Sequence, residues 1–403
     1  MSAAPTDLAG APSVSGTGAV FPVPSSLPLS LYVHIPWCVR KCPYCDFNSH
    51  VPQVAVEQEA YIDALLRDLD QEMARQPLGE IQSVFIGGGT PSLFDGAAIG
   101  RLLEGIARRL TLVADIEITL EANPGTVEVA RFVDYRAAGV NRLSIGVQSL
   151  DDQRLAALGR IHSAAEALHA YRVARDVGFD NVNLDLMFGL PRQRVADALS
   201  DLEQVIALQP EHLSWYQLTL EPNTAFHHKP PPLPDDDSLA DIMELGQQRL
   251  EAAGYRRYEV SAYAREGRRC THNVNYWQFG DYLGIGAGAH GKLTATGMRV
   301  WRRAKQRHPA AYLAAQGGRI VSTEAEVTGN ELALEFLLNA LRLSEGVPRG
   351  YFAQRTGLDL ADLAPALGRA QALGLLDADP TRLRASALGF RFLNDLLGLF
   401  QAD

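Results

Sequence analysis

The sequence predicts an α/β protein: a partial (β/α)6 barrel followed by a smaller α+β domain of winged-helix-like form. Residues 31–222 alternate short β-rich runs with helical patterns six times. After residue 330 the expected order changes to three helices, a two-stranded patch and a final helix. Eight repeats would close a full barrel, so six favour a partial one. The chain of 403 residues is long enough for both domains.

Strands are expected where β-branched and aliphatic residues form short runs, and helices where apolar residues recur every three or four positions. The expected strands are Leu31–Ile35, Ser83–Ile86, Ile116–Leu120, Arg142–Val147, Asn181–Met187 and Leu213–Leu220. The expected helices are Glu57–Arg75, Ala97–Leu110, Glu128–Ala138, Ala164–Val177 and Val195–Leu208. This alternation predicts parallel strands with right-handed crossovers, whose carboxyl ends gather on one side.

Four segments are expected along the chain. They are a disordered leader at 1–28, the barrel at 29–255, a linking region of short strands and Gly-rich turns at 256–325, and the C-terminal domain at 326–403. The leader lacks the basic start and continuous apolar core of a secretory signal. In the C-terminal domain the two-stranded patch is expected around Leu376–Ala385 and the last helix at Ala387–Phe400.

Composition excludes several classes of protein. Lys and Arg number 37 against 47 Asp and Glu, a net charge of −10, and no basic run could follow a phosphate backbone. Nucleic acid is therefore not an expected partner. Without a run of about 18 apolar residues, no transmembrane segment is expected, and a cytoplasmic location follows. Only four cysteines occur, three of them within eight residues, which indicates a metal site and not a disulfide scaffold.

The clustered cysteines are Cys38, Cys42 and Cys45, a C-x3-C-x2-C pattern just beyond the first expected strand. Thiolates are the ligands of iron–sulfur clusters, usually four of them. Three local thiolates leave one iron open to chelate a small molecule. Zinc, with His34 or His50 as a fourth ligand, is the competing interpretation. Zinc sites usually bring a second CxxC pair, and none follows in this sequence, so iron–sulfur is favoured.

Two further groups follow the second and third strands. Gly87, Gly88 and Gly89 precede Thr90, and bare glycines let backbone N–H groups approach a ligand carboxylate closely. The triplet alone would also fit a tight turn. Glu121 ends the third strand, where a carboxylate could accept both hydroxyls of a ribose. The alternative is an ordinary acid at the start of a helix.

Gln148 and Asp185 end the next two strands, and Arg160 lies in the connection between them. An acid inside the apolar run 182–190 is costly unless it faces a site or pairs, for instance with Arg160. These three residues therefore belong either to a binding site or to a buried structural network.

The cysteine segment resembles radical S-adenosylmethionine (SAM) proteins. From about Pro28 to the C-terminus the chain resembles the oxygen-independent coproporphyrinogen III oxidase-like family, in particular its heme chaperone branch. The resemblance implies a [4Fe–4S] cluster on Cys38, Cys42 and Cys45 within a radical SAM barrel. The glycine motif, Gly88 and Gly89 included, would hold the amino and carboxylate end of SAM. The residues implied near the cluster-bound SAM are Tyr32, Gly88 and Glu121, and those near a second SAM are Tyr44, Thr90, Gln148, Arg160 and Asp185.

Two departures from the oxidase pattern put coproporphyrinogen decarboxylation in doubt. The oxidases carry a fourth cysteine where this chain has Phe47, and a structured N-terminal segment where this chain has low-complexity sequence. The resemblance therefore implies a heme chaperone that delivers heme to acceptor hemoproteins, membrane-associated ones among the candidates. The alternative is an oxygen-independent coproporphyrinogen III oxidase or another radical SAM enzyme acting on a tetrapyrrole. Whether the chain is an enzyme stays open, and no catalytic residue is singled out.

The resemblance connects one motif with heme, the HNxxY pattern of His272 to Tyr276. Imidazole and phenolate are both known axial ligands of heme iron. A His and a Tyr four residues apart could equally be a satisfied core pair. His290, in a Gly-rich loop, is a possible second ligand or a core residue, and Arg268 and Arg269 could meet propionates. Cys270 is not expected to bind the cluster, because a buried thiol is common.

Overall fold

The computed structural model describes residues 27–315 and 317–401. The predicted leader, residues 1–28, lies outside this range except for its last two residues. No helix in the described ranges is both long and apolar enough to cross a membrane.

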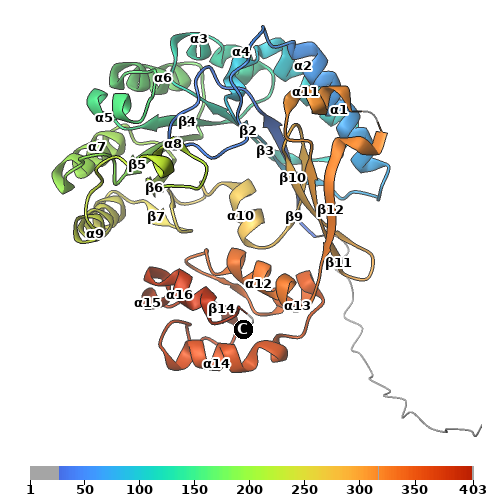
Figure 1. Cartoon of the computed structure of the whole chain (residues 1–403), viewed down its shortest axis with the longest axis vertical. Coiled ribbons are helices and arrows are strands. Elements are labelled where there is room, and N and C mark those ends of the chain that lie inside the picture. The colour runs from blue at the N-terminus through green and yellow to red at the C-terminus, as the bar shows by residue number, and fades with distance from the viewer. Residues whose placement is uncertain (1–26, 316, 402–403) are drawn as a thin grey trace, which may run out of the picture.

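Six parallel strands form the barrel wall and pair in sequence order from β1 to β6. Their bounds are β1 Leu29–Ile35, β2 Ile81–Gly88, β3 Leu112–Ala122, β4 Arg142–Gln148, β5 Val182–Phe188 and β6 His212–Gln217. The helices lie on the outer face (Figure 1). They are α1 Gln58–Met73, α2 Gly96–Ala107, α3 Thr126–Val129, α4 Phe132–Ala137, α5 Asp152–Ala157, α6 Ala164–Asp176, α7 Val195–Ala207, α8 Ala225–His228 and α9 Asp236–Ala252, with a short η1 at Pro91–Leu93. The predicted partial barrel is confirmed.

Successive side chains of β1 point alternately into the apolar core beneath the helices and into the barrel interior. In β1, Leu31, Val33 and Ile35 are fully buried in the main apolar core. The intervening Tyr32 and His34 point inward, because successive strand residues face opposite sides. The predicted helix Glu128–Ala138 is two helices, α3 and α4. The break lies at Arg131, whose guanidinium donates to the carbonyl oxygens of Ser92 at 2.8 Å and Leu93 at 2.7 Å.

The predicted linking region extends the same sheet at both edges. Antiparallel β8 and β7 continue it beyond β6, while β9, parallel to β1, is followed by antiparallel β10, β11 and β12. The bounds are β7 Arg256–Arg257, β8 Ala262–Ala264, α10 Thr271–Trp277, β9 Asp281–Ile285, β10 His290–Ala295, β11 Arg299–Lys305, α11 Pro309–Ala314, η2 Gly317–Ile320 and β12 Val321–Val327. Helix α10 was not predicted, and it carries the HNxxY motif.

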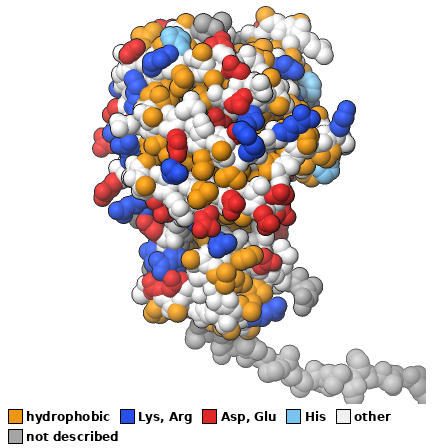
Figure 2. Space-filling model, turned by 90° about the vertical axis from the view of Figure 1, so that its left-hand side faces the viewer, with side chains coloured by type: hydrophobic (Ala, Val, Ile, Leu, Met, Phe, Trp, Pro, Cys, Tyr) orange, Lys and Arg blue, Asp and Glu red, His pale blue; other side chains and the backbone are white. Residues whose placement is uncertain are grey.

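The C-terminal domain is α+β, as predicted, and in Figure 1 it lies below the barrel with α10 between them. Its elements are α12 Gly329–Ala340, β13 Val347–Pro348, α13 Gly350–Thr356, η3 Leu360–Leu363, α14 Ala364–Ala372, β14 Arg382–Leu383, α15 Ala387–Arg391 and α16 Leu393–Gly398. Strands β13 and β14 pair, and Leu376 bridges to Ala385. The predicted final helix is split at Phe392, whose φ of −112° and ψ of 47° are not helical. Figure 2 shows one face of the molecule, where acidic and basic side chains alternate over both parts.

Candidate cluster and SAM site

A pocket of about 470 Å³ opens at the carboxyl ends of the barrel strands. The predicted site residues that line it are Cys38, Cys42, Tyr44, Cys45, Gly88, Gly89, Thr90, Glu121, Gln148, Arg160 and Asp185. Tyr32 is the one predicted cluster or SAM residue that does not line it. Parallel strands explain this convergence, because their carboxyl ends meet at one edge of the barrel.

The loop that carries the three cysteines, residues 36–50 (the cysteine loop), is closed at its base by backbone hydrogen bonds. The Cys38 N–H donates to the His50 carbonyl at 3.0 Å, and the His50 N–H donates to the Pro36 carbonyl at 2.7 Å. Within the loop, the Cys45 N–H donates to the Cys42 carbonyl at 3.2 Å. All three thiols are partly exposed toward the pocket. Phe47, in the place of the oxidases' extra cysteine, also lines the pocket and is 60% exposed.

The donor set fits an iron–sulfur cluster better than a single zinc ion. In the described part of the chain, no three His, Cys, Asp or Glu side chains converge as ligands of one metal ion. A cluster does not need that convergence, because each thiolate binds a different iron. His34, one zinc ligand considered, already uses both ring nitrogens. Its Nε2–H donates to the Asn48 carbonyl at 2.9 Å, and its Nδ1 accepts from the Tyr32 hydroxyl at 2.9 Å.

Two polar side chains reach the cluster cysteines. The Thr90 hydroxyl donates to Cys38 Sγ at 3.5 Å, and Arg160 Nη1 donates to Cys42 Sγ at 3.8 Å. The same guanidinium donates to Asn123 Oδ1 at 2.6 Å and to the Gly146 carbonyl at 3.0 Å. A fixed cation beside a thiolate stabilises its negative charge. Asn123 was missed in the sequence, although it stands two residues after Glu121.

The glycine motif is held close to its neighbours. Gly88 has a φ of +115°, and an added Cβ would lie 2.5 Å from the His34 ring. Its N–H donates to Glu121 Oε2 at 3.0 Å. Burial, and secondarily the charge of Asp185, raise the pKa of Glu121 to about 7, although the Gly88 N–H acts to lower it. Glu121 is therefore a carboxyl group that titrates near neutral pH at the pocket wall.

The predicted pair of Asp185 with Arg160 is not formed. The Asp185 carboxylate accepts from the Asn183 side chain at 2.8 Å and from the Ser144 hydroxyl at 3.4 Å, and burial raises its pKa. Arg160 instead donates to Cys42 Sγ, Asn123 Oδ1 and the Gly146 carbonyl. The suggestion of an ion pair was wrong because neutral donors on β4 and β5 lie closer to the acid. Gln148, at a φ of 67°, accepts from the Tyr216 hydroxyl at 2.8 Å.

Tyr32 lies one layer below the pocket. Its hydroxyl bonds to His34, and its ring lies 6.3 Å from the rings of both Phe85 and His272. Tyr32 therefore links the pocket side of the barrel interior to helix α10 at the amino end.

Helix α10 closes the amino end of the barrel with the HNxxY motif facing inward. His272 is 5% exposed, its ring stacks on Phe85 at 5.0 Å, and its Nδ1 lies 3.2 Å from the Ser83 hydroxyl. Burial, and then the charge of Arg142, lower the pKa of His272 to about 3, so the imidazole is neutral. The Tyr276 ring stacks on Tyr282 at 4.0 Å. The structure therefore places both motif residues against core side chains.

The other residues predicted around the motif are spread apart. Arg269 pairs with Glu345 at 2.5 Å, and Arg268 lies 3.8 Å from Asp180. Cys270 is fully buried and donates to Glu117 Oε1 at 3.5 Å, away from the pocket lining. His290 is exposed at the start of β10.

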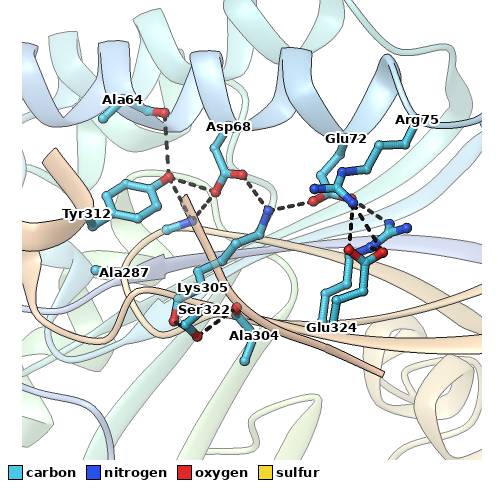
Figure 3. Close-up of polar contacts among 12 residues, drawn as sticks. Ala64, Asp68, Glu72, Arg75, Ala287, Ala304, Lys305, Tyr312, Ser322 and Glu324 are labelled. Atoms are coloured by element: carbon cyan, nitrogen blue, oxygen red, sulfur yellow. Dashed lines mark hydrogen bonds and ion pairs between the residues drawn. The ribbon is translucent and has the colours of Figure 1, made fainter. Parts of the chain in front are cut away.

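A buried charged network, which the sequence did not predict, joins α1 to Lys305 of β11 and Tyr312 of α11 (Figure 3). Lys305 of β11 donates to Asp68 at 2.5 Å and Glu72 at 2.6 Å, both on α1. Asp68 also accepts from the Tyr312 hydroxyl at 2.8 Å and the Gly286 N–H at 3.2 Å.

The loop that this network holds then contacts the cysteine segment. The Asn48 side-chain amide donates to the carbonyls of Ala287 and Arg307, each at 2.9 Å. The Tyr61 hydroxyl donates to the His34 carbonyl at 2.8 Å and accepts from the Ala287 N–H at 2.9 Å. The segment 286–287 is therefore fixed between α1 and the cysteine loop.

Comparison with known proteins agrees with this geometry. The family model of the radical SAM superfamily matches residues 32–205, and that of the HemN C-terminal domain matches residues 327–392. The protein named heme chaperone HemW of Escherichia coli strain K12 is 52% identical over 93% of this chain and 99% of its own length. The HemW of Haemophilus influenzae is 48% identical over 94% of this chain and 100% of its own. This chain belongs to the HemW family of radical SAM proteins. Membership of the superfamily implies a [4Fe–4S] cluster and SAM.

Two less similar proteins, a bovine relative and a solved structure, also match most of this chain. A bovine mitochondrial protein named radical S-adenosyl methionine domain-containing protein 1 is 38% identical over 94% of this chain and 89% of its own. The solved structure of coproporphyrinogen III oxidase (HemN) from Escherichia coli has a TM-score of 0.77. It is 24% identical and covers 93% of this chain and 90% of that one, which shows a shared fold.

Proposed function

We propose that this protein is a heme chaperone, which binds heme and delivers it to acceptor hemoproteins on a radical SAM scaffold. The observation that carries the proposal is the 52% identity, over 93% of the chain, to a protein named heme chaperone HemW. The acceptors, with membrane-associated hemoproteins among the candidates, would be reached in the cytoplasm.

Phe47 supports this function over decarboxylation of coproporphyrinogen. Its ring is 60% exposed at the pocket, at the position where the resemblance expects a further cysteine in the oxidases. A phenyl ring can neither ligate iron nor donate a proton. The pocket of this chain therefore lacks a thiol at that position.

The pocket residues divide between the implied cofactors. Cys38, Cys42 and Cys45 would hold the cluster, Gly88 and Gly89 the amino and carboxylate end of SAM, and Glu121 its ribose. When bound, the cluster supplies one electron for the reductive cleavage of SAM. Tyr32 would act on this site from below, by holding the His34 ring against Gly88.

The proposal includes a second SAM molecule in the same pocket. Its assigned residues are Tyr44, Thr90, Gln148, Arg160 and Asp185, all on the pocket wall. Arg160 and Thr90 also contact cluster cysteines, so they would sit between the two cofactors.

Heme binding through the HNxxY motif, with His272 as ligand and Tyr276 beside it, stays a hypothesis. The His272 imidazole is 5% exposed beneath the barrel, so α10 would have to separate from β2 before iron could reach it. The stacking of Tyr276 on Tyr282 would be lost in the same movement.

The test is a paired assay on the full chain after anaerobic reconstitution. We expect saturable binding of hemin and its transfer to a heme-free b-type cytochrome, with no protoporphyrinogen formed from coproporphyrinogen III. Phe47→Cys is the matched variant, and it should not alter hemin transfer. Decarboxylation by the parent protein without hemin transfer would instead support the oxidase.

A further inference from the structure

The side chain of Asn123 lies in the pocket wall between two residues that contact cluster cysteines. Asn123 follows β3, two positions after Glu121, and lines the pocket. Its Oδ1 accepts from Arg160 Nη2 at 2.6 Å, and its Nδ2 donates to the Thr90 hydroxyl at 2.9 Å. Thr90 and Arg160 are 33 and 37 residues away along the chain. One amide therefore joins two polar groups that come from different strand ends of the barrel.

Arg160 fixes the direction of each hydrogen bond in this series. A guanidinium carries only donors, so the Asn123 atom that faces it must be the oxygen. The amide nitrogen therefore faces Thr90 and donates to its hydroxyl oxygen. That hydroxyl has a single proton, which is left for Cys38 Sγ at 3.5 Å. A carboxylate in place of the amide would accept the same proton and leave Cys38 without this donor.

The guanidinium of Arg160 also reaches a second cluster cysteine. Its Nη1 donates to Cys42 Sγ at 3.8 Å, while its Nη2 donates to Asn123 and to the Gly146 carbonyl at 3.0 Å. A Cβ at Gly146 would lie 3.3 Å from Nη2, so the glycine leaves room for the guanidinium. Asn123 is therefore one of the two oxygen acceptors that hold this cation beside the cysteine sulfur.

The backbones around these side chains are held independently of Asn123. The Thr90 N–H donates to the carbonyl of Trp37, the residue before the first cysteine, at 2.7 Å. Gly159 has a φ of +71°, and an added Cβ would lie 2.8 Å from Cδ of Pro43 in the cysteine loop. The turn that carries Arg160 is thus packed directly on that loop. A substitution at position 123 is expected to change the direction of the donors and not the backbone that carries them.

Donors at the cysteine sulfurs bear on the redox properties of a cluster. Reduction adds one negative charge to the iron–sulfur unit and its thiolates, and donors or cations at the sulfurs stabilise that charge. The potentials of iron–sulfur clusters therefore depend on net charge, on hydrogen bonds to the sulfurs and on solvent exposure. Thr90 is 3% exposed, so water competes little for its hydroxyl.

We propose that Asn123 is a positioning residue for the iron–sulfur cluster. It directs the Thr90 hydroxyl toward Cys38 and holds Arg160 beside Cys42, and through these two donors it raises the reduction potential of the cluster. This role goes beyond the proposed function and does not depend on the cargo of the protein, because the donors act on the cysteine sulfurs.

The test is a redox titration of the reconstituted full chain with dithionite, without SAM, followed by electron paramagnetic resonance of the reduced cluster. Asn123→Asp has nearly the same size, but its carboxylate accepts the Thr90 proton and offsets the charge of Arg160. We expect the one-electron reduction equilibrium to become about tenfold less favourable, a negative shift of about 59 mV in the midpoint potential. Iron content is measured beside each titration.

Two further variants separate the direction of the hydroxyl from the added charge. Thr90→Val removes the hydroxyl without adding a charge, and it should shift the midpoint in the same direction by a smaller amount. Asn330→Asp is the matched control, because it makes the same chemical change at an exposed residue of α12, outside the pocket. Its midpoint should equal that of the parent.

The double variant of Asn123→Asp with Thr90→Val decides how Asn123 acts. Its midpoint should match that of Asn123→Asp alone, because the hydroxyl proton has already been turned away from Cys38. Fully additive shifts would mean that the carboxylate acts by its charge only, and the proposed role would be wrong. An unchanged midpoint in Thr90→Val at the parent iron content would overturn it as well. If Asn123→Asp assembles no cluster, Asn123→Ala releases both donors without adding a charge, and a midpoint equal to the parent's would then contradict the proposal.

Discussion

The two ends of the barrel are both lined with polar side chains, but these side chains are paired to different degrees. At the amino end, α10 is tied to the barrel strands by several hydrogen bonds. Glu117 accepts from the first two N–H groups of the helix, and Asn275 donates to the Ser30 hydroxyl at 3.0 Å. At the carboxyl end, Glu121 accepts from the Gly88 N–H at 3.0 Å and lines the pocket.

This difference shows that the side chains of one motif can be packed into the core while those of another stay open to a pocket. A core histidine is stabilised by using its nitrogens within the protein, whereas a ligand must keep one lone pair free. His272 is packed on both sides by Phe85 and Tyr276. The cysteines at the other end remain partly exposed.

The largest effect is expected at the carboxyl end, from Cys38→Ala, Cys42→Ala or Cys45→Ala. Each change removes the thiolate of one iron, so the brown chromophore and bound iron should be lost. Cys270→Ala is the control at the amino end, because its thiol contacts Glu117. Iron analysis and absorption after anaerobic reconstitution measure both. Zinc bound in place of iron would show that the cluster assignment is wrong.

The second effect concerns the buried network of Lys305 with Asp68 and Glu72. Lys305→Met leaves Asp68 and Glu72 buried without their cation, and it should lower the free energy of unfolding by ~3–5 kcal/mol. Iron content should fall as well, because Gly286 is held by the same carboxylate. Arg108→Met breaks the exposed pair with Glu104 and should cost less than ~0.5 kcal/mol. Denaturant unfolding of the two variants measures the difference between the buried and the exposed ion pair. Equal unfolding midpoints would contradict the prediction.

The third effect tests the amino end. His272→Ala removes a packed ring and should destabilise the protein by ~2–4 kcal/mol through the cavity left beside Phe85. Iron content and SAM binding should stay at the parent level. Thermal unfolding and equilibrium dialysis with SAM measure these. A loss of SAM binding at unchanged stability would mean that α10 is coupled to the pocket.

The smallest effect is a pH dependence at Glu121. Its pKa of about 7 means that the carboxylate is half ionised near neutral pH and protonated below it. The ionised form accepts hydroxyl hydrogens of a ribose, so SAM affinity should fall as the pH drops from 8 to 6, by up to ~tenfold over the whole range. Glu121→Gln should bind more weakly but with a flat profile. A parent profile that is equally flat would separate Glu121 from the ribose.

The sequence was most informative for features that depend on neighbouring residues along the chain, such as the positions of the strands. The six strands appeared at their predicted places, because β-rich runs between turn residues are a local property. The convergence of Cys38, Gly88, Glu121, Gln148 and Asp185 followed from it, since each ends or follows a parallel strand. The spacing of the cysteines, a covalent feature of the chain, already favoured a cluster over zinc.

Tertiary structure alone decided which polar groups are paired across long separations. Lys305 and Asp68 meet only because β11 extends the sheet beside α1, and no pattern marks a charge that folding will bury. The same holds for Asn123, which meets Thr90 and Arg160 from two other strand ends of the barrel. The sequence determined which side chains were available for chemistry. The packing of elements distant along the chain determined which of them are buried and paired and which face a pocket, because desolvation and hydrogen-bond pairing depend on neighbours in space.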